Sequence, residues 1–197
     1  GLEWMSNNGI TAGSITEEVM YWMAKSGCKA FKVGVESGNS DRLRSIRKPA
    51  TKDSLRKAGV IFGKYPEIFV NGNYIIGFPE ETFGEMMDTF DFANELAWDW
   101  AGFLIYQPAA GTPMAEAFPS APKDANDEEI IKGLIPSRFA QQKETFGYYK
   151  GYHSGDQVSQ SILSGRDIFD LPKNEIPSEE QIKEVWFTFN LITNFFN

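Results

Sequence analysis

The chain has 197 residues, of which 42% are hydrophobic and 14% aromatic, and this composition supplies enough apolar side chains for a folded core. Its 19 basic and 27 acidic residues give a net charge of −8, which argues against a nucleic acid or an anionic membrane bound by charge. Cys28 is the single cysteine and His153 the single histidine, so an intrachain disulfide and a Cys/His metal cluster are excluded.

The apolar runs are shorter than the roughly 18 residues of a membrane helix, and no signal-peptide pattern opens the chain. We therefore expect a cytoplasmic protein without a membrane span and without a nucleic-acid partner. The chain starts at Gly1 without a methionine and stops directly after Phe195 and Phe196, so we expect it to be a piece of a longer protein.

From Thr11 to Pro113, helix and strand patterns alternate in units of about 35 residues, which predicts βα units around a parallel sheet. Residues 2–6 predict a short first strand. A capping-box pattern at Ser14–Glu17 predicts the start of a helix that stops at Ser26-Gly27. The apolar residues 30–35 then predict a buried strand.

Two further helix–strand pairs follow. A helix is predicted to begin near Thr51, and residues 69–76 form the next strand. Thr82 with Glu85 makes a second capping box, whose helix leads to a strand at residues 101–106. All three later strands have the length and apolar character of buried parallel strands.

The pattern changes after Pro113, where the chain becomes rich in Pro, Ala and Asp and then helical without strand partners. We expect one domain at residues 1–118 and a helical C-terminal extension at residues 119–197. The extension should hold a helix interrupted at Pro136 and a final helix capped by Ser178 with Gln181.

Polar and glycine-containing segments follow three of the predicted strands, namely residues 36–40, 77–82 and 107–113. Ligands gather at the carboxyl ends of parallel strands, so these segments should share one rim. Glu36 and Ser37 offer a carboxylate and a hydroxyl for hydroxyls or an amine of a polar cofactor. Gly77 lacks a side chain, so a flat ring can lie against its backbone.

Each candidate also has a structural interpretation. Glu36 can serve only as a capping or salt-bridging carboxylate, and Gly77 only as a turn residue. Cys28 fits a small core residue between a helix stop and a buried strand. His153 is a lone histidine with no Cys or Asp directly beside it and fits a structural or solvated side chain.

Three segments carry a family resemblance: GVESGNSDRLRSIRK (residues 34–48), YIIGFPEET (74–82) and YQPAAGTPM (106–114). In this order they resemble the C-terminal part of a radical S-adenosylmethionine enzyme core, most of all its cobalamin-binding subgroup. The resemblance covers roughly residues 1–118 and implies an α/β fold. It would be the C-terminal portion of a six-stranded, partial (β/α) TIM-like barrel, followed by the helical extension.

The resemblance implies an enzyme that reductively cleaves S-adenosylmethionine to a 5′-deoxyadenosyl radical. Its cofactors would be S-adenosylmethionine and a four-iron four-sulfur cluster, with cobalamin added if the chemistry is methyl transfer. An external donor such as flavodoxin or ferredoxin would supply electrons, and the substrate, a small molecule or another compound, is not specified. The cluster motif CxxxCxxC is absent from this chain, so its ligands would lie elsewhere and the chain alone should be inactive.

The family's binding residues carry over to six positions. Glu36 and Ser37 would contact the ribose or methionine part, Gly77 and Phe78 would frame the adenine, and Gln107 and Pro108 would line the other side. No metal ligand and no catalytic residue can be assigned. The chain departs from the pattern at Glu80, where the family has Gly in a GFPGET run, and at Asn73, where a Gly often stands.

Three alternatives stay open. A radical enzyme without cobalamin would be methylthiotransferase-like or an oxidoreductase. A degenerate barrel without a cluster would act as a binding module. An ordinary (β/α)-barrel enzyme would carry phosphate or metal ligands in another part of the barrel, because fold alone does not determine chemistry.

Overall fold

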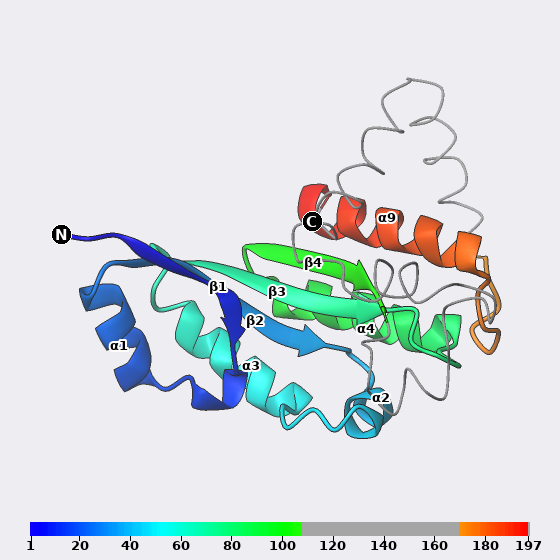
Figure 1. Cartoon of the computed structure of the whole chain (residues 1–197), viewed down its shortest axis with the longest axis horizontal. Helices are drawn as coiled ribbons and strands as arrows, with labels where there is room; N and C mark the ends of the chain where they lie inside the picture. The colour runs from blue at the N-terminus through cyan, green and yellow to red at the C-terminus, as the bar shows by residue number, and fades with distance from the viewer. Residues whose placement is uncertain (108–169, 197) are drawn as a thin grey trace, which may run out of the picture. The chain divides into compact units, whose positions relative to one another are not determined.

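The computed structural model describes residues 1–107 and 170–196. Within these ranges, four strands form one parallel sheet whose strands are neighbours in chain order (Figure 1). They are β1 (Trp4–Ile10), β2 (Cys28–Glu36), β3 (Phe69–Ile76) and β4 (Trp100–Ile105). The predicted parallel α/β architecture is confirmed. The predicted boundary at residue 118 and the helix around Pro136 lie outside the described residues.

One helix crossover joins each strand to the next. The helices are α1 (Glu17–Lys25), which follows the short 3-10 helix Ala12–Ser14, then α3 (Lys52–Phe62) and α4 (Phe83–Leu96). A short helix, α2 (Ser40–Ser45), lies between β2 and α3. Figure 1 shows α1 and α3 along one side of the sheet.

Alternate residues of the strands point into the core beneath the helices. Phe31 and Val33 of β2, Tyr74 and Ile76 of β3, and Phe103 of β4 are buried. The positions between them form what we call the second face of the sheet, which includes these residues: Lys32, Gly34, Asn71, Asn73 and Gly102. This two-sided pattern follows from the period of two in a strand.

Local capping signals locate most helix starts correctly. Thr51 and Thr82 cap α3 and α4, each with a reciprocal bond three residues on. The start predicted for α1 is wrong, because Thr16 and not Ser14 accepts the bond from Val19 N. The Ser14 hydroxyl instead donates to the Thr11 carbonyl within the 3-10 turn. Helix α2 has only six residues, too few to show a hydrophobic period.

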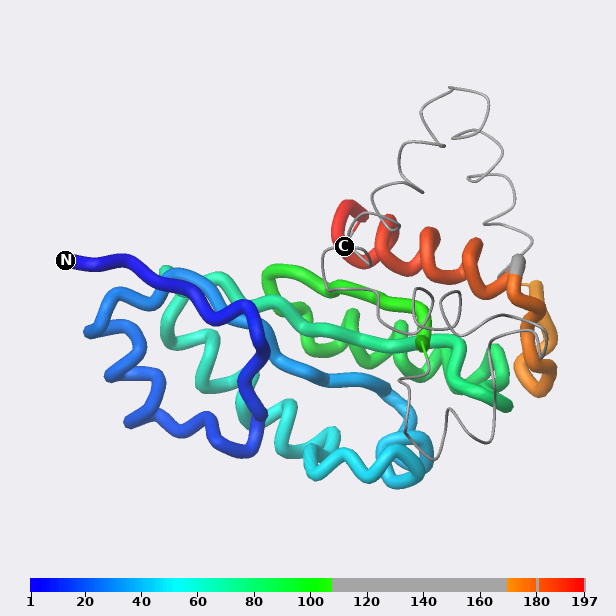
Figure 2. Tube along the Cα trace, in the orientation of Figure 1, coloured from blue at the N-terminus to red at the C-terminus, as the bar shows by residue number. Residues whose placement is uncertain are grey.

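The last helix, α9 (Glu179–Phe195), begins at the predicted Ser178 cap and belongs to the same compact unit as the sheet. It runs along β4 (Figure 2). Asn194 accepts a bond from Ala101 N and donates to Ala101 O, at 2.9 and 2.8 Å. Asn190 makes the same pair of bonds with Phe103, at 3.1 and 3.2 Å.

The spacing explains why two asparagines can pair with a strand. Four residues along a helix rise about 6 Å and two residues along a strand about 6.6 Å, so Asn190 and Asn194 meet alternate residues of β4. Their side-chain amides satisfy the backbone groups of β4 that face away from β3. Helix α9 thus takes the place of a neighbouring strand at this edge. Among the helices of the described ranges, none is both long and apolar enough to cross a bilayer.

Candidate functional site

The carboxyl end of β2 places an ion pair on the second face of the sheet. Glu36 has φ 70° and follows a shift in the β2–β3 register, which turns its side chain back over the strand. Its Oε1 lies 2.7 Å from Lys48 Nζ, and both side chains are about one-fifth exposed, at 22% and 23%. A Cβ atom at Gly34 would lie 2.7 Å from that Oε1 and 2.9 Å from Nζ, so the pair sits directly over a glycine.

Lys48 reaches this position through the end of α2. The Lys48 N–H donates to the Leu43 carbonyl at 2.9 Å, and Arg47 between them has φ 55°. This is the Schellman ending of a helix, which reverses the chain within one turn. Lys48 was not among the predicted site residues, although it closes the first of the three family-like segments. Its distance of 12 residues from Glu36 hides the pairing in the sequence.

Ser37 is fully buried, and its hydroxyl is already used within the chain. Ser37 Oγ lies 3.2 Å from Thr89 Oγ1 of α4 and accepts a bond from Asn39 N at 3.0 Å. The next residue, Gly38, donates its N–H to the same Thr89 Oγ1 at 3.0 Å. These bonds fasten the turn to α4, so Ser37 as a direct ligand contact stays a prediction that its burial does not favour.

The loop after β3 is organised around a buried carboxylate. Glu81 Oε2 accepts bonds from Gly77 N at 2.6 Å and Phe78 N at 3.0 Å, while its Oε1 has no partner. Burial raises the pKa of Glu81 to about 7, against the opposing effects of the Phe78 N–H, the Arg42 charge and the Gly77 N–H. This role of Glu81 is not visible in the sequence pattern, because Glu81 lies among other acidic residues.

Arg42 connects the two strand ends. Its guanidinium donates to the Pro79 carbonyl at 3.2 Å and to Glu85 Oε2 at 3.0 Å, and it lies 5.8 Å from the centre of the Phe78 ring. Arg42 belongs to α2, which follows β2, whereas its partners belong to the loop after β3 and to α4. The two segments are therefore held as one structural unit.

Gly77 occupies a position that demands glycine, in agreement with its interpretation as a turn residue. It has φ 77°, and a Cβ atom there would lie 3.0 Å from Ile182 Cγ2 of α9. Ile182 thus lies where a side chain at residue 77 would point, and the contact of a flat ring with the Gly77 backbone stays a prediction. Glu80 has φ 59°, a left-handed conformation that glycine adopts without strain, so the backbone here suits the Gly that the GFPGET pattern would place at this position.

The remaining predicted residues are less fully placed. Phe78 is buried beneath the loop, and Gln107 is exposed two residues beyond the end of β4. Pro108 lies outside the described residues. Asn73 lies level with Gly34 and Gly102 across the sheet, where the backbone on either side carries no side chain.

The chain's own residues do not fit an iron–sulfur cluster. Cys28, its single cysteine, is buried at the start of β2, the opposite end of the strand from Glu36. Burial raises the pKa of the Cys28 thiol, which disfavours the thiolate that a metal requires. In the described ranges, no three His, Cys, Asp or Glu side chains gather closely enough to hold a metal ion.

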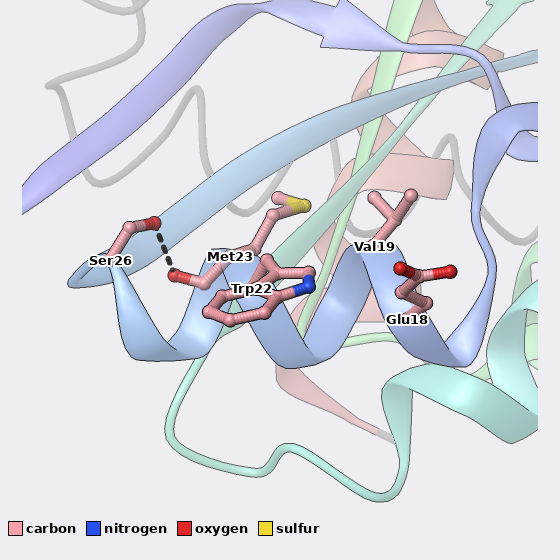
Figure 3. Close-up of a pocket in the computed structure, with 5 residues that line it drawn as sticks. All are labelled: Glu18, Val19, Trp22, Met23 and Ser26. Carbon is pink, nitrogen blue, oxygen red and sulfur yellow. Dashed lines mark hydrogen bonds between the residues drawn. The ribbon is translucent and has the colours of Figure 1, made fainter.

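A shallow groove lies on α1, away from the strand ends (Figure 3). It is lined by Glu18, Val19, Trp22, Met23 and Ser26, and the Ser26 hydroxyl donates to the Met23 carbonyl. Its lining is mostly apolar and offers few groups that could orient a polar cofactor. We therefore place the candidate site at the carboxyl ends of β2 and β3.

The chain matches no family model, but it is similar in sequence to curated methylthiotransferases. It is 30% identical over 184 residues to the ribosomal protein uS12 methylthiotransferase RimO of Desulforamulus reducens, covering 88% of this chain and 41% of that protein. It is 33% identical over 94 residues to the tRNA-2-methylthio-N(6)-dimethylallyladenosine synthase of Ruegeria pomeroyi, covering 47% of this chain and 21% of that protein. The chain thus spans less than half the length of these relatives.

Two solved structures are similar in part. The radical S-adenosylmethionine methyltransferase TsrM of Kitasatospora setae aligns with a TM-score of 0.46 at 17% identity, over 51% of this chain and 20% of that one. The coproporphyrinogen III oxidase HemN of Escherichia coli aligns with a TM-score of 0.49 at 15% identity, over 84% and 38%.

The sequence relatives conflict with one expectation and support another. Several are named for tRNA, which conflicts with the expectation, drawn from net charge, that no nucleic acid is involved. Net charge describes the whole chain and says little about one surface. The RimO alignment covers 88% of this chain and so includes residues 34–48 and 74–82, and it supports the resemblance to radical S-adenosylmethionine enzymes that rests on these segments.

Proposed function

We propose that this chain is the part of a radical S-adenosylmethionine enzyme that holds S-adenosylmethionine at the carboxyl ends of β2 and β3. The Glu36–Lys48 pair carries the proposal. The methionine end of S-adenosylmethionine has one ammonium and one carboxylate group, and the pair offers one carboxylate and one ammonium. Because both side chains keep some exposure, they can exchange their mutual contact for contacts with a ligand.

The other predicted contacts complete the proposal. Adenine would lie near Gly77 and Phe78, using main-chain groups of the loop, since Ile182 fills the space beside Gly77. Gln107 and Pro108 would line the opposite side of the ligand. Ser37 would act through the turn that presents Glu36, because its hydroxyl is bonded to Thr89 and Asn39.

When reduced by an iron–sulfur cluster, bound S-adenosylmethionine gives methionine and a 5′-deoxyadenosyl radical that abstracts hydrogen from a substrate. This chain supplies no cluster ligands. Its residues would bind and orient the sulfonium compound and keep water from the reacting carbon. Reductant, cluster and substrate would be held by other parts of the enzyme or by its partners, including an external electron donor.

For the class of reaction, the sequence relatives favour methylthio transfer over cobalamin-dependent methyl transfer. The target would then be a tRNA base or a ribosomal protein side chain, in the cytoplasm. Methyl transfer with cobalamin is the second candidate and rests on the subgroup resemblance of the sequence.

Sequencing the coding DNA upstream of Gly1 separates these candidate functions. A CxxxCxxC loop supports a catalyst, a preceding DxHxxG pattern adds cobalamin, and an upstream barrel without cysteines indicates a binding module.

Calorimetric titration of S-adenosylmethionine into the 197-residue chain tests the site itself. We expect Glu36→Gln and Lys48→Met each to weaken binding about tenfold or more, because a charge-assisted contact is lost. Adenosine, which lacks the methionine end, should bind wild type and both variants equally. Lys64→Met is the matched control, since Lys64 pairs with Glu17 and lies five residues before the start of β3, at the opposite end of that strand from the candidate site. Equal affinity for S-adenosylmethionine in all four proteins would reject the proposed site.

A further inference from the structure

The segment before α9 lies against the first turn of α4. Phe83 N donates to the Glu175 carbonyl and Gly84 N to the Lys173 carbonyl, both at 2.8 Å. The first N–H groups of a helix have no partner within the helix, so their bonding must come from elsewhere. Here it comes from a segment about 90 residues further along the chain (Figure 2).

Gly84 permits this close approach. A Cβ atom at residue 84 would lie 2.8 Å from the Lys173 carbonyl oxygen and 3.3 Å from Lys173 Cβ. The nearer of these atoms belongs to backbone, which cannot swing aside as a side chain can. The contact between the two segments therefore depends on a residue without a side chain.

A second contact lies at the other end of the same loop. Ile182, in the first turn of α9, places Cγ2 3.0 Å from the position of a Gly77 Cβ. Residues 173–182, which we call the C-terminal clamp, thus touch the loop at Gly77, where it leaves β3, and just beyond Thr82, where α4 begins. Helix α9 is itself fixed to β4 by Asn190 and Asn194.

The geometry points to the C-terminal clamp as a positioning element for the Gly77–Thr82 loop. It acts through two contacts, Ile182 against Gly77 and Lys173 against Gly84. This inference rests on the proposed function, because that loop is the proposed adenine contact. The loop holds Glu80 in the left-handed region and folds Gly77 N and Phe78 N onto Glu81. A strained loop of this kind keeps one conformation only when its surroundings determine it. The clamp provides that support and sets the loop's position relative to β4.

Two matched substitutions in α9 test the inference. Ile182→Ala removes the contact with Gly77, whereas Ile192→Ala removes the same atoms from a partly buried position nearer the end of α9. Amide hydrogen exchange of Gly77 and Phe78 is measured by NMR without ligand, and S-adenosylmethionine affinity by calorimetry. We expect Ile182→Ala to speed both exchange rates about tenfold and weaken binding about fivefold, while Ile192→Ala lowers Tm without either effect.

Two further variants keep the test decisive. Ile182→Val keeps a methyl group against Gly77, so Gly77 and Phe78 should exchange at the wild-type rate. Gly84→Ala should speed their exchange, because it disturbs the contact with Lys173. Unchanged exchange of Gly77 and Phe78 in Ile182→Ala would overturn the inference that the C-terminal clamp positions the loop, whatever the affinity for S-adenosylmethionine. Faster exchange with no S-adenosylmethionine binding in wild type would support the clamp and reject the proposed function.

Discussion

The turn after β2 and the loop after β3 solve the same problem with different chemistry. Each leaves the sheet through a residue with positive φ, Glu36 in one and Gly77 in the other, and each has buried N–H groups to satisfy. After β2 the acceptor is the Thr89 hydroxyl, a neutral group on α4. After β3 it is the Glu81 carboxylate, a group of the loop itself. The first turn therefore depends on close packing against α4, and the second depends on an ionisable group within the loop.

The largest expected effect comes from adding one methyl group to the β2 turn. A Cβ atom at Gly38 would lie 2.2 Å from the Asp88 carbonyl oxygen and 2.7 Å from Thr89 Cα, so α4 or the turn must move. We expect Gly38→Ala to lower the free energy of unfolding by about 4 kcal/mol. Urea unfolding followed by tryptophan fluorescence measures the change.

Gly34→Ala is the control for this prediction. Its methyl group would meet only the ends of the Glu36 and Lys48 side chains, which can rotate away. We expect a loss below about 1.5 kcal/mol. Equal losses for the two glycines would show that the turn is not packed against α4 as described.

The next largest effect is a pH dependence specific to the β3 loop. Burial raises the pKa of Glu81 from 4.5 to about 7, so the folded state holds a proton that the unfolded state releases. Its contribution to stability is complete below pH 4.5 and is lost as the pH rises through 7. The free energy of unfolding should fall by roughly 3 kcal/mol across this window through Glu81 alone.

Glu81→Gln isolates this contribution, because glutamine keeps an oxygen acceptor for Gly77 N and Phe78 N but does not titrate. The difference in unfolding free energy between wild type and Glu81→Gln, measured from pH 4 to 8, should be constant below pH 4.5, fall between pH 4.5 and 7, and level off above pH 7. Glu80→Gln is the control, since Glu80 is exposed. Parallel pH profiles for wild type and Glu81→Gln would contradict the description of the loop.

A smaller effect should follow from removing the hydroxyl of the β2 turn. Thr89→Val keeps the shape of the side chain but leaves Gly38 N without an acceptor and Ser37 Oγ without one of its partners. We expect a loss of about 2 kcal/mol that does not vary between pH 5 and 8. Ser37→Ala should cost less, about 1 kcal/mol, since Thr89 would still accept from Gly38 N. A larger loss for Ser37→Ala would make Ser37 the main anchor of the turn.

The sequence predicted the elements whose causes are local. Residues 69–76 form β3 as predicted, and the caps at Thr51, Thr82 and Ser178 begin their helices, because each depends on neighbours within a few residues. The same logic placed Glu36 and Gly77 at the carboxyl ends of adjacent parallel strands.

The groups that complete the site were not predictable in this way. Lys48 meets Glu36 only because α2 ends in a Schellman turn, and Thr89 meets Ser37 across 52 residues. In the sequence, Asn190 and Asn194 look like ordinary polar residues of a helix. Their bonds to the backbone of β4 become visible only in the folded structure. Such partners depend on tertiary packing, which a periodic pattern does not encode.

The smallest expected effect concerns Glu80, one of the two positions at which the chain departs from the family pattern. Its φ of 59° puts a Cβ atom close to the following carbonyl, a strain that glycine avoids. Glu80→Gly should therefore raise the free energy of unfolding by roughly 0.5 to 1 kcal/mol, since the relief of strain exceeds the added freedom of the unfolded chain. Ala97→Gly, at the left-handed end of α4 with φ 45°, should give a similar gain away from the loop. A gain at Ala97 but a loss at Glu80, in paired urea titrations, would mean that the glutamate side chain itself holds the loop. The two strand ends would then both depend on side-chain contacts, and the loop's left-handed turn would no longer explain why glycine suits that position.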